Sequence, residues 1–360
     1  MRIVYFLRDI SDCGGIQQTT CTMINKISQI NEKCIISTVS LYHKNVKPFF
    51  EIDSSIKNYC LFSRPVDTKK QFIKIKIRCA EVLESKDPDI IVVQGTAFSN
   101  YIPNYVWKKC KVIVCEHGHF YMGGKYGLHW FGKRKALRRA RAIVTLTSLD
   151  AENYKKYNVR QIPVINIYNP CINQQSSALN YDSASKIIVS CGTLDTIKRF
   201  DHVIETAKHV FKRYPDWKWY IFGDGKQRDS LQYMIEDYNL QNNIILKGYE
   251  QDKNVIYGNK AFLVLTSKFE GFGMVLIEAM QFRLPVISYD INYGPREIIR
   301  NGENGYLVSD GNINELALTV EKLISDVEMR KKLSDGACKS LESFSLEKIT
   351  NQWIDLFESI

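Results

Sequence analysis

Short apolar runs rich in β-branched residues alternate along the chain with longer amphipathic stretches. In the first half, the apolar runs cover residues 2–7, 34–40, 89–94, 111–115, 142–147 and 164–168. Helical periodicity fills residues 16–30 and 69–85 between them. Near-continuous apolar strands separated by helices are typical of parallel sheets that are covered on both faces. The pattern therefore predicts a doubly wound α/β domain over residues 1–170.

The periodicity stops at residues 171–185, CINQQSSALNYDSAS, which are mostly polar and are predicted to form a linker. A second series of apolar runs follows at residues 186–191, 217–222, 244–247, 262–266 and 285–289, with helical patterns at 200–213, 228–238 and 274–281. This predicts a second doubly wound domain over residues 186–344, followed by a C-terminal helix over 345–360. We expect the two domains to face each other across a cleft, with ligands at the carboxyl ends of the strands.

The totals agree with a globular protein of two domains, because 360 residues exceed one ordinary core and 45% of them are apolar. None of the ten cysteines forms a Cys-x-x-Cys pair, so a zinc site or a thioredoxin-like motif has no support. The apolar start of the chain is too short for a signal peptide, and no run approaches the ~18 apolar residues of a membrane span. We therefore expect a cytoplasmic protein.

The net charge of +10 is unevenly distributed. Residues 1–175 contain 27 Lys and Arg against 13 Asp and Glu, a net charge of +14, whereas residues 176–360 carry a net charge of −4. A basic half joined to a mildly acidic half predicts different partners for the two halves.

Several predicted strands run into glycine turns that open a helix. In the first half, RDISDCGGIQQTT places Gly14 and Gly15 at a helix start, where backbone amides attract anions. The spacing is not G-x-G-x-x-G, so a dinucleotide fingerprint is absent. Taken alone, this turn fits a ligand site and a plain βα turn equally well.

The second half has three such turns. CGTLDTIKRF places Lys198 and Arg199 at a helix start, where a cation opposes the helix dipole and is easier to explain beside an anionic ligand. FGDGKQRDSL contains Gly223 in a second turn, and KFEGFGMVLIEAM is the third. Each turn alone has an ordinary structural explanation, but three on one sheet favour a phosphate-bearing ligand.

The third turn carries two glutamates eight residues apart, Glu270 in the loop and Glu278 in the helix. Gly271 and Gly273 permit the turn and expose amides to phosphate, and carboxylates accept hydrogen bonds from sugar hydroxyls. The alternative, a turn residue and a surface helix residue, fits less well because Glu278 has mostly apolar neighbours.

These motifs resemble the E-x7-E signature of the family 4 glycosyltransferases, in particular those of bacterial surface-polysaccharide synthesis. The segment DINYGPREIIRNGENGYLV at residues 290–308 adds a further match, and the resemblance covers nearly the whole chain. It implies the GT-B fold, with two Rossmann-like domains, the acceptor on the N-terminal one, the nucleotide sugar on the C-terminal one, and the last helix packing toward the N-terminal domain. It also implies transfer with retention of anomeric configuration.

The resemblance assigns roles to residues of the third turn. Glu270 matches the glutamate that contacts the donor sugar, and Glu278 matches the one that holds the ribose. Phe272, Gly273 and Met274 match the backbone cradle of the diphosphate and the sugar.

Outside that turn, Lys198 matches the cation that neutralises the leaving diphosphate. Thr193 stands where family members usually have an arginine, and Arg199 is a candidate to compensate. His117 in CEHGHF matches the histidine near the donor sugar, with His119 as the rival.

Residues 125–142 form a second candidate site, a basic stretch with aromatic residues that is expected to face an acceptor or a membrane. Its members are Trp130, Phe131, Lys133, Arg134, Lys135, Arg138 and Arg139. A solvated helix face is the alternative. With the glycosyltransferase resemblance, the stretch predicts a lipid-linked glycan acceptor at the inner face of the plasma membrane, and no nucleic acid.

The only Asp-x-Asp, Asp87-Pro88-Asp89, precedes an apolar strand and is interpreted as a turn, so neither a metal nor another cofactor is expected. The predicted co-substrate is a nucleoside-diphosphate sugar, with UDP as the favoured nucleotide. A nucleotide-sugar epimerase or a non-catalytic binding protein on the same fold remain the alternatives. A phosphorylase is disfavoured because nothing suggests a lysine-bound pyridoxal cofactor.

Overall fold

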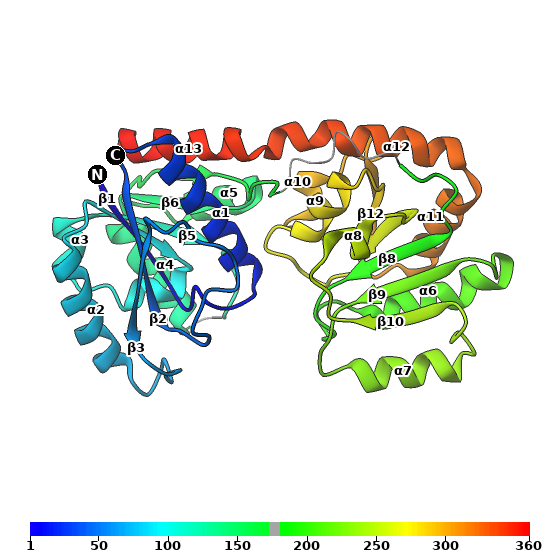
Figure 1. Ribbon diagram of the computed structural model, residues 1–360, viewed down its shortest axis with the longest axis horizontal. Coiled ribbons are helices and arrows are strands. Elements are labelled where there is room, and N and C mark those ends of the chain that lie inside the picture. Colours follow the sequence, from blue (N-terminus) through cyan, green and yellow to red (C-terminus); the bar gives the residue numbers. More distant parts are fainter. Residues whose placement is uncertain (125, 173–180) are drawn as a thin grey trace. The chain divides into compact units, whose positions relative to one another are not determined.

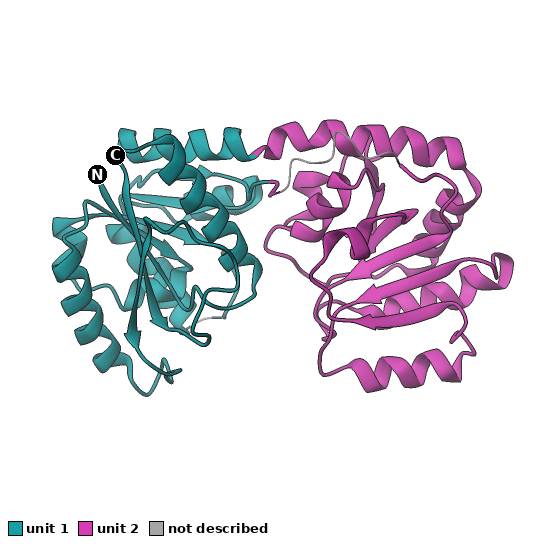
Figure 2. Ribbon diagram, in the orientation of Figure 1, with its two compact units in different colours: residues 1–170, 346–360 teal, residues 171–345 magenta. Residues whose placement is uncertain are grey.

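The computed structural model describes residues 1–124, 126–172 and 181–360. The chain divides into two compact units, shown in Figure 2: unit 1 is Met1–Pro170 with Leu346–Ile360, and unit 2 is Cys171–Ser345. Residues 173–180, the greater part of the predicted linker, lie outside the described residues. Its end is bound to unit 2, because the Tyr181 hydroxyl donates to the carbonyl of Ala261 and the Ser185 hydroxyl donates to that of Asn259.

Unit 1 is built on a parallel sheet with the strand order β3-β2-β1-β4-β5-β6-β7 (Figure 1). The strands are β1 (Arg2–Leu7), β2 (Ile35–Tyr42), β3 (Lys57–Phe62), β4 (Ile90–Gln94), β5 (Lys111–Glu116), β6 (Ala142–Thr145) and β7 (Val164–Asn166). The helices are α1 (Gly15–Ile30), α2 (Phe72–Lys86), α3 (Val106–Lys109), α4 (Leu128–Arg139), α5 (Ser148–Lys156) and α13 (Leu346–Ser359), with a 3-10 turn η1 (Thr96–Asn100).

Alternating side chains of the central strand β1 enter two separate cores. Ile3 and Tyr5 pack on one face with residues of α1 and α13, and Val4 and Phe6 pack on the other face with residues of α2 and α4. Because successive strand side chains point to opposite faces, a strand that is apolar at every position needs helices on both sides. The C-terminal helix α13 therefore completes the core of unit 1.

Unit 2 repeats the design with the order β10-β9-β8-β11-β12-β13. Its strands are β8 (Ile187–Cys191), β9 (Lys218–Phe222), β10 (Ile244–Gly248), β11 (Phe262–Leu265), β12 (Val286–Asp290) and β13 (Gly305–Ser309). Its helices are α6 (Phe200–Arg213), α7 (Arg228–Asp237), α8 (Lys253–Tyr257), α9 (Met274–Gln281), α10 (Pro295–Ile298), α11 (Ile313–Ser325) and α12 (Val327–Ser340), with a 3-10 turn η3 (Leu341–Phe344).

In both sheets the chain starts in the middle and the strand order reverses there. The reversal lies between β1 and β4 in unit 1 and between β8 and β11 in unit 2. Loops that leave such neighbouring strands diverge to opposite faces, which opens a ligand site at the carboxyl ends of the strands. These two switch points fix where functional residues of each unit are expected.

The predicted doubly wound sheets are confirmed, but two edge strands were not predicted. The strand β3 begins with a lysine and an asparagine, and its first two residues are exposed. The strand β13 is only five residues long and starts with Gly305. Both are edge strands of parallel sheets, and an edge strand is less completely covered than a central one. Its sequence therefore needs fewer apolar residues, so the run of apolar residues that marks a strand is weak. No helix among the described residues is long and apolar enough to cross a membrane.

Candidate functional site

The glycine turns at the carboxyl end of the unit 2 sheet fit closely together. A Cβ on Gly223, after β9, would lie 1.9 Å from the carbonyl oxygen of Gly192, after β8. A Cβ on Gly225 would lie 2.5 Å from the carbonyl oxygen of Leu194. Because real Cβ atoms do not approach backbone this closely, only glycine lets these two turns pack against each other.

The turn after β8 is also bound to the turn after β11 across the switch point. The Thr266 hydroxyl donates to the carbonyl of Lys198 at 2.8 Å, and the amide of Lys268 donates to the carbonyl of Ile197 at 2.7 Å. Two segments about 70 residues apart in sequence are thereby held in one fixed arrangement.

This arrangement brings Lys198 and Glu270 into direct contact. The Lys198 Nζ lies 2.6 Å from the Glu270 Oε1, and the Ser267 hydroxyl donates to the same oxygen at 2.6 Å. The side chains are 20% and 12% exposed, so the pair is only partly open to solvent. A Cβ on Gly192 would lie 3.1 Å from the Lys198 Cε, so this glycine gives the lysine room to cross the turn.

The loop after β12 closes on the other side of Glu270. Gly294 has a φ of +89°, and a Cβ there would lie 2.5 Å from the Phe272 carbonyl oxygen and 3.2 Å from the Glu270 Cβ. A side chain at this position would be strained and would displace the turn that carries Glu270. This contact holds the DINYGPRE loop against the EGFG turn.

The second glutamate lies in α9, which begins after Gly273 at a φ of +93°. Glu278 is buried, and its Oε2 accepts hydrogen bonds from the Tyr257 hydroxyl at 2.7 Å and the Lys253 Nζ at 2.8 Å. The Leu276 amide donates to the Gly273 carbonyl at 2.9 Å. The amides of Met274 and Val275, which begin the helix, can therefore bind an anion. Each glutamate is thus paired with a different lysine, Glu270 with Lys198 and Glu278 with Lys253. The two glutamates can therefore bind different parts of a ligand.

Arg199 does not join Lys198 in facing Glu270. Its backbone adopts a φ of +50° before α6, and its Nη1 lies 2.6 Å from the Asp310 Oδ1. The predicted pair of cations at this helix start is therefore divided, because Arg199 neutralises Asp310. Thr193, at the position of the usual family arginine, is exposed in the turn after β8.

In unit 1, His117 follows β5 and its Nε2 is hydrogen bonded to Oε1 of Gln94, the last residue of β4. Burial lowers the pKa of His117 to about 4, so the imidazole is neutral at pH 7. His119 differs, because its carbonyl accepts a hydrogen bond from the Lys133 Nζ at 3.1 Å. Burial, followed by the nearby Lys133, lowers the pKa of His119 as well.

The loop after β5 is held by buried charges. The Glu116 Oε2 accepts from the Tyr154 hydroxyl at 2.7 Å and lies 3.9 Å from the Lys133 Nζ. The Asp150 Oδ1 accepts from the Phe120 amide at 2.7 Å, whereas its Oδ2 has no hydrogen-bond partner among the described residues. Burial is the main cause that raises the pKa of Asp150 to about 7.

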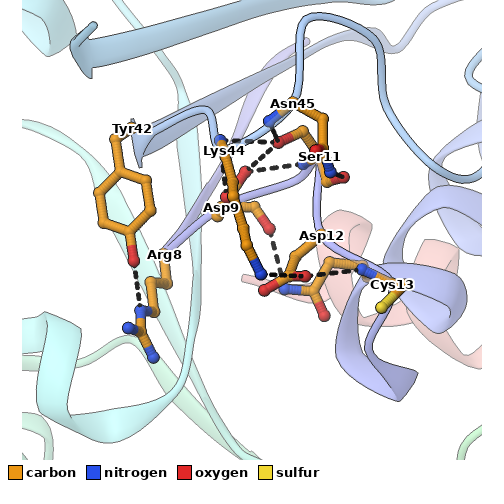
Figure 3. A network of polar contacts seen from close by, with 9 residues as sticks. Arg8, Asp9, Ser11, Asp12, Cys13, Tyr42, Lys44 and Asn45 are labelled. Carbon is orange, nitrogen blue, oxygen red and sulfur yellow. Dashed lines mark hydrogen bonds and ion pairs between the residues drawn. The ribbon is translucent and has the colours of Figure 1, made fainter. Parts of the chain in front are cut away.

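The predicted turn at Gly14 and Gly15 is shaped by a buried carboxylate (Figure 3). The Asp9 Oδ1 accepts from the amide and the hydroxyl of Ser11, and its Oδ2 accepts from the amide of Lys44 at 2.9 Å. The Asn45 side chain donates to the Ser11 carbonyl at 2.8 Å. This network joins the loops after β1 and β2 and positions the start of α1.

Gly14 precedes α1 with an ordinary φ of −86°, and a Cβ there would meet only the flexible end of Gln17. A Cβ on Gly15 would meet nothing within 4 Å. Unlike the turns at Gly223 and Gly225 in unit 2, this turn does not need glycine for packing.

The predicted basic face on α4 needs one correction. Lys133 is buried, and its Nζ donates to the carbonyls of Phe120 at 2.5 Å and Met122 at 2.8 Å. It fastens the loop after β5 and does not face a membrane. Lys135 is half-buried and donates to the Ile102 carbonyl, and burial lowers its pKa to about 8. The predicted residues that stay exposed are Phe131, Arg134, Arg138 and Arg139.

Comparison with known proteins adds to this geometry. Residues 172–340 match the family model described as glycosyl transferases group 1. This match covers nearly all of unit 2, and the relatives of the chain are glycosyltransferases. A relative from Haemophilus influenzae, an uncharacterized glycosyltransferase, is 27% identical over 357 residues, which cover 98% of each chain.

Two further matches span nearly the whole chain. A Campylobacter jejuni enzyme is 24% identical over all of this chain and 99% of its own, and its name describes transfer of N-acetyl-D-galactosamine to a diphosphoundecaprenol-linked glycan. The structure of S. aureus TarM, in complex with fondaparinux, alpha-GlcNAc-glycerol and UDP, has a TM-score of 0.80 at 18% identity and covers 99% of this chain and 100% of that one. The shared fold is the GT-B fold.

The Asp87-Pro88-Asp89 segment of this glycosyltransferase is a structural turn. Asp87 binds Arg2 and Lys109 at 2.7 Å each, and the Asp89 Oδ2 accepts from the amide of Arg2 at 2.7 Å. Among residues 1–124, 126–172 and 181–360, no group of three or more His, Cys, Asp or Glu is arranged to hold a metal ion.

Sequence reasoning missed the residues that support the glutamates and the histidine. Ser267 contacts Glu270, Tyr257 and Lys253 contact Glu278, and Gln94 contacts His117. Ser267 and Gln94 were the easier ones to find, because each is a polar residue at the end of an apolar strand. Tyr257 and Lys253 lie in the short helix α8, for which the sequence has no distinctive pattern.

Proposed function

We propose that this glycosyltransferase moves a sugar from a UDP-sugar to a hydroxyl of a lipid-linked glycan, with retention and without a metal, in cell-surface polysaccharide synthesis. The observation that carries the proposal is the contact between Lys198 and Glu270 at the switch point of unit 2. A cation and a hydrogen-bond acceptor lie together beside the amides of the α9 N-terminus, which suits a diphosphate joined to a sugar.

On this proposal, the diphosphate lies on the amides at Phe272, Gly273 and Met274, and Lys198 Nζ turns from Glu270 to the phosphate oxygens. Glu270 is then free to accept from a sugar hydroxyl. Glu278 uses Oε2 for Tyr257 and Lys253, which leaves Oε1 to accept from a ribose hydroxyl.

The reaction breaks the bond between the anomeric carbon and the diphosphate oxygen, and the electron pair leaves with the diphosphate. The acceptor oxygen bonds to the anomeric carbon on the same face, and its proton passes to the departing phosphate. Because negative charge grows on the leaving group, fixed positive groups there lower the barrier most. Lys198 and the helix amides supply that charge, which supports a reaction that needs no metal.

His117 enters this scheme as a neutral group, because its lowered pKa removes a charged imidazolium at pH 7. We assign it to hydrogen bonding with a donor-sugar hydroxyl, held in place by Gln94. The Gly14 and Gly15 amides are a further proposed contact with the donor.

Two observations support the proposed lipid-linked acceptor and the proposed location at the membrane. The Campylobacter jejuni relative acts, by its name, on a glycan linked to undecaprenol through a diphosphate. The exposed arginines of α4 would be attracted to the inner face of the plasma membrane, because the anionic lipids of that face attract basic side chains that lie close to it. We place the protein there as a peripheral enzyme.

The test is a panel of nucleoside-diphosphate sugars, scored by thermal shift and by slow hydrolysis with and without EDTA. We expect a UDP-sugar to stabilise the protein and to be turned over equally in EDTA, and the product anomer determined by NMR to match that of the donor. If no nucleotide sugar raises the melting temperature, the donor assignment is wrong. Loss of turnover in EDTA would overturn the metal-free proposal, and an inverted product would overturn retention.

A further inference from the structure

Unit 1 contains a hollow of about 770 Å³ between the loop after β5, the helix α4 and the segment that follows α5. Its wall is largely apolar and aromatic, with contributions from Phe120, Met122, Trp130, Leu137, Tyr157 and Val159. Ligand pockets typically measure about 300–1,000 Å³ and have apolar walls with a few polar groups. This hollow therefore has the size and lining of a binding site, and neither glycine-turn site uses it.

The wall is held in place by fixed contacts. The rings of Phe120 and Tyr157 stack at 4.7 Å with an interplanar angle of 8°, and Tyr154 packs edge-on against Phe120 at 4.9 Å. The buried Lys133 Nζ donates to the carbonyls of Phe120 and Met122. Because the loop is fastened to both α4 and α5, the pocket exists before any ligand arrives, which lowers the cost of binding.

Three arginines line the same hollow, namely Arg134, Arg138 and Arg160. The Arg134 guanidinium lies 4.6 Å from the centre of the Trp130 ring, and the Arg160 Nη1 donates to the Arg138 carbonyl at 3.3 Å. None of the three forms an ion pair with a carboxylate among the described residues, whose ion pairs all involve other cations. Three positive charges without acidic partners form a site for an anion.

Arg138 connects this hollow to two others. It also lines a hollow of about 710 Å³ with Trp107, Lys108, Arg139 and Arg160. It lines a third, of about 450 Å³, whose wall includes Trp130, Phe131 and Arg134. No Asp or Glu lines any of the three. The apolar pocket thus lies beside two hollows whose charged lining residues are all basic.

We propose that this pocket binds one molecule of a lipid phosphate, with its hydrocarbon chain against Phe120, Tyr157 and Val159 and its phosphate or diphosphate on Arg134, Arg138 and Arg160. An apolar cavity next to unpaired arginines is complementary to both ends of such an amphiphile. A polyanion without a chain would leave the apolar wall in water, and a flat bilayer surface would leave the hollow unfilled. The inference rests on the proposed function, in which it gives the lipid part of the acceptor a binding site.

The experiment measures binding of farnesyl diphosphate, a soluble prenyl diphosphate, to the full-length protein by calorimetry in the absence of donor. Farnesol and inorganic diphosphate serve as the two halves of the probe, and phosphatidylglycerol vesicles serve as the bilayer. The variants are Arg138→Gln with Arg141→Gln as its exposed control, and Val159→Glu with Val159→Gln as its control. Val159 is 94% exposed, so neither change there disturbs the fold.

We expect farnesyl diphosphate to bind at least tenfold more tightly than farnesol or inorganic diphosphate. Arg138→Gln and Val159→Glu should each weaken binding about tenfold, since one removes a cation and the other places a carboxylate at the pocket. The two controls should bind as the unchanged protein does. The proposal is overturned if farnesyl diphosphate and inorganic diphosphate bind with equal affinity. It is also overturned if neither Arg138→Gln nor Val159→Glu weakens the binding of farnesyl diphosphate. Binding to the vesicles without binding to farnesyl diphosphate overturns it as well.

Hydrolysis of the nucleotide sugar in the absence of acceptor separates this inference from the proposed function. Arg138→Gln should leave that hydrolysis unchanged, because the proposed contacts with the diphosphate belong to the turns of unit 2 and not to α4. If the unchanged protein hydrolyses a UDP-sugar but does not bind farnesyl diphosphate, only the lipid site is wrong. If it binds farnesyl diphosphate but no nucleotide sugar, the proposed function is wrong.

Discussion

The two switch points have the same strand order around them but different chemistry. In unit 2 a lysine and a glutamate meet at 2.6 Å, beside turns that only glycine can form. In unit 1 the corresponding region has a neutral histidine bound to Gln94 and a buried Asp9 whose hydrogen bonds go to Ser11 and backbone amides. The unit 2 edge pairs a cation with a carboxylate, whereas the unit 1 edge binds its buried carboxylate with a hydroxyl and backbone amides.

This difference teaches that fold position alone does not make a charged site. In unit 1, Arg134, Arg138 and Arg139 are exposed on α4. The ion pair in the turns after β1 and β2 of unit 1, Lys44 with Asp12 at 3.6 Å, is 61% and 40% exposed, whereas Lys198 and Glu270 are 20% and 12% exposed. In the proposal, unit 2 therefore binds the diphosphate through its charged groups. Unit 1 contributes hydrogen bonds and a pocket for an amphiphile that has an anionic end and an apolar end.

The largest expected effect comes from the glycine turns. Gly223→Ala forces a Cβ to within 1.9 Å of a backbone oxygen, so the turns after β8 and β9 must separate. We expect unit 2 to lose about 3 kcal/mol or more of unfolding free energy, measured by urea denaturation. Gly15→Ala is the unit 1 comparison, because its Cβ meets open space at a helix start, and it should stabilise by about 0.5–1 kcal/mol. Equal changes in unfolding free energy for Gly223→Ala and Gly15→Ala would show that neither turn depends more than the other on its glycine.

The second effect concerns charge at the unit 2 switch point. Lys198→Ala should lower kcat for sugar transfer by about 10²–10³, because it removes a cation aimed at the leaving diphosphate. The matched control is Lys268→Ala, an exposed lysine in the neighbouring turn, which should change kcat less than twofold. If the two variants lose kcat to a comparable extent, the position of Lys198 beside Glu270 is not what matters. Each lysine then acts only through its contribution to the overall positive charge of this region.

The order of most elements followed from the apolar pattern, which missed only the edge strands β3 and β13 among the described strands. The pattern placed Lys198 and Glu270 in turns of one sheet, but their direct contact was not predicted. Other features depended on distant residues. Asp310, which draws Arg199 away, is 111 residues further along the chain. The burial of Lys133 did have a signal, because residues 133, 136, 137 and 140 form a helical stripe that is otherwise apolar.

A smaller effect concerns the stability of unit 1 against pH. The folded pKa of Asp150 is about 7 and its unfolded value is 3.8, so between these values the folded protein binds more protons. Its contribution is therefore fully present below pH 3.8 and is lost as the pH rises to 7, with a slope of at most about 1.4 kcal/mol per pH unit. The groups that face Asp150 are Glu116 and Lys133, and their charges modify this slope.

Asp150→Asn should remove that pH dependence and make the protein more stable at pH 8, as measured by urea denaturation from pH 4 to 8. The asparagine keeps an oxygen that can accept from the Phe120 amide. Glu152→Gln, an exposed change in the same helix, is the control and should leave the curve as it is. A parallel pH profile for Asp150→Asn and the unchanged protein would contradict the raised pKa.

The smallest effect concerns the neutral histidine of unit 1. His117→Gln should lower kcat about tenfold, since it replaces one hydrogen-bonding side chain by another. Because the pKa of His117 is about 4, the profiles of kcat/KM for the two proteins should have the same shape from pH 5.5 to 8. A step near pH 6.5 that disappears in His117→Gln would show that the histidine is charged in the reaction.

The most direct test of the central claim compares the affinities of UDP and UMP by calorimetry in the unchanged protein, in Lys198→Ala and in Lys268→Ala. If the second phosphate lies beside Lys198, then Lys198→Ala should weaken UDP binding at least tenfold while UMP binding changes less than threefold. Lys268→Ala should affect neither nucleotide. Equal affinities for UDP in the unchanged protein and in Lys198→Ala would contradict the assignment of the unit 2 switch point to the diphosphate.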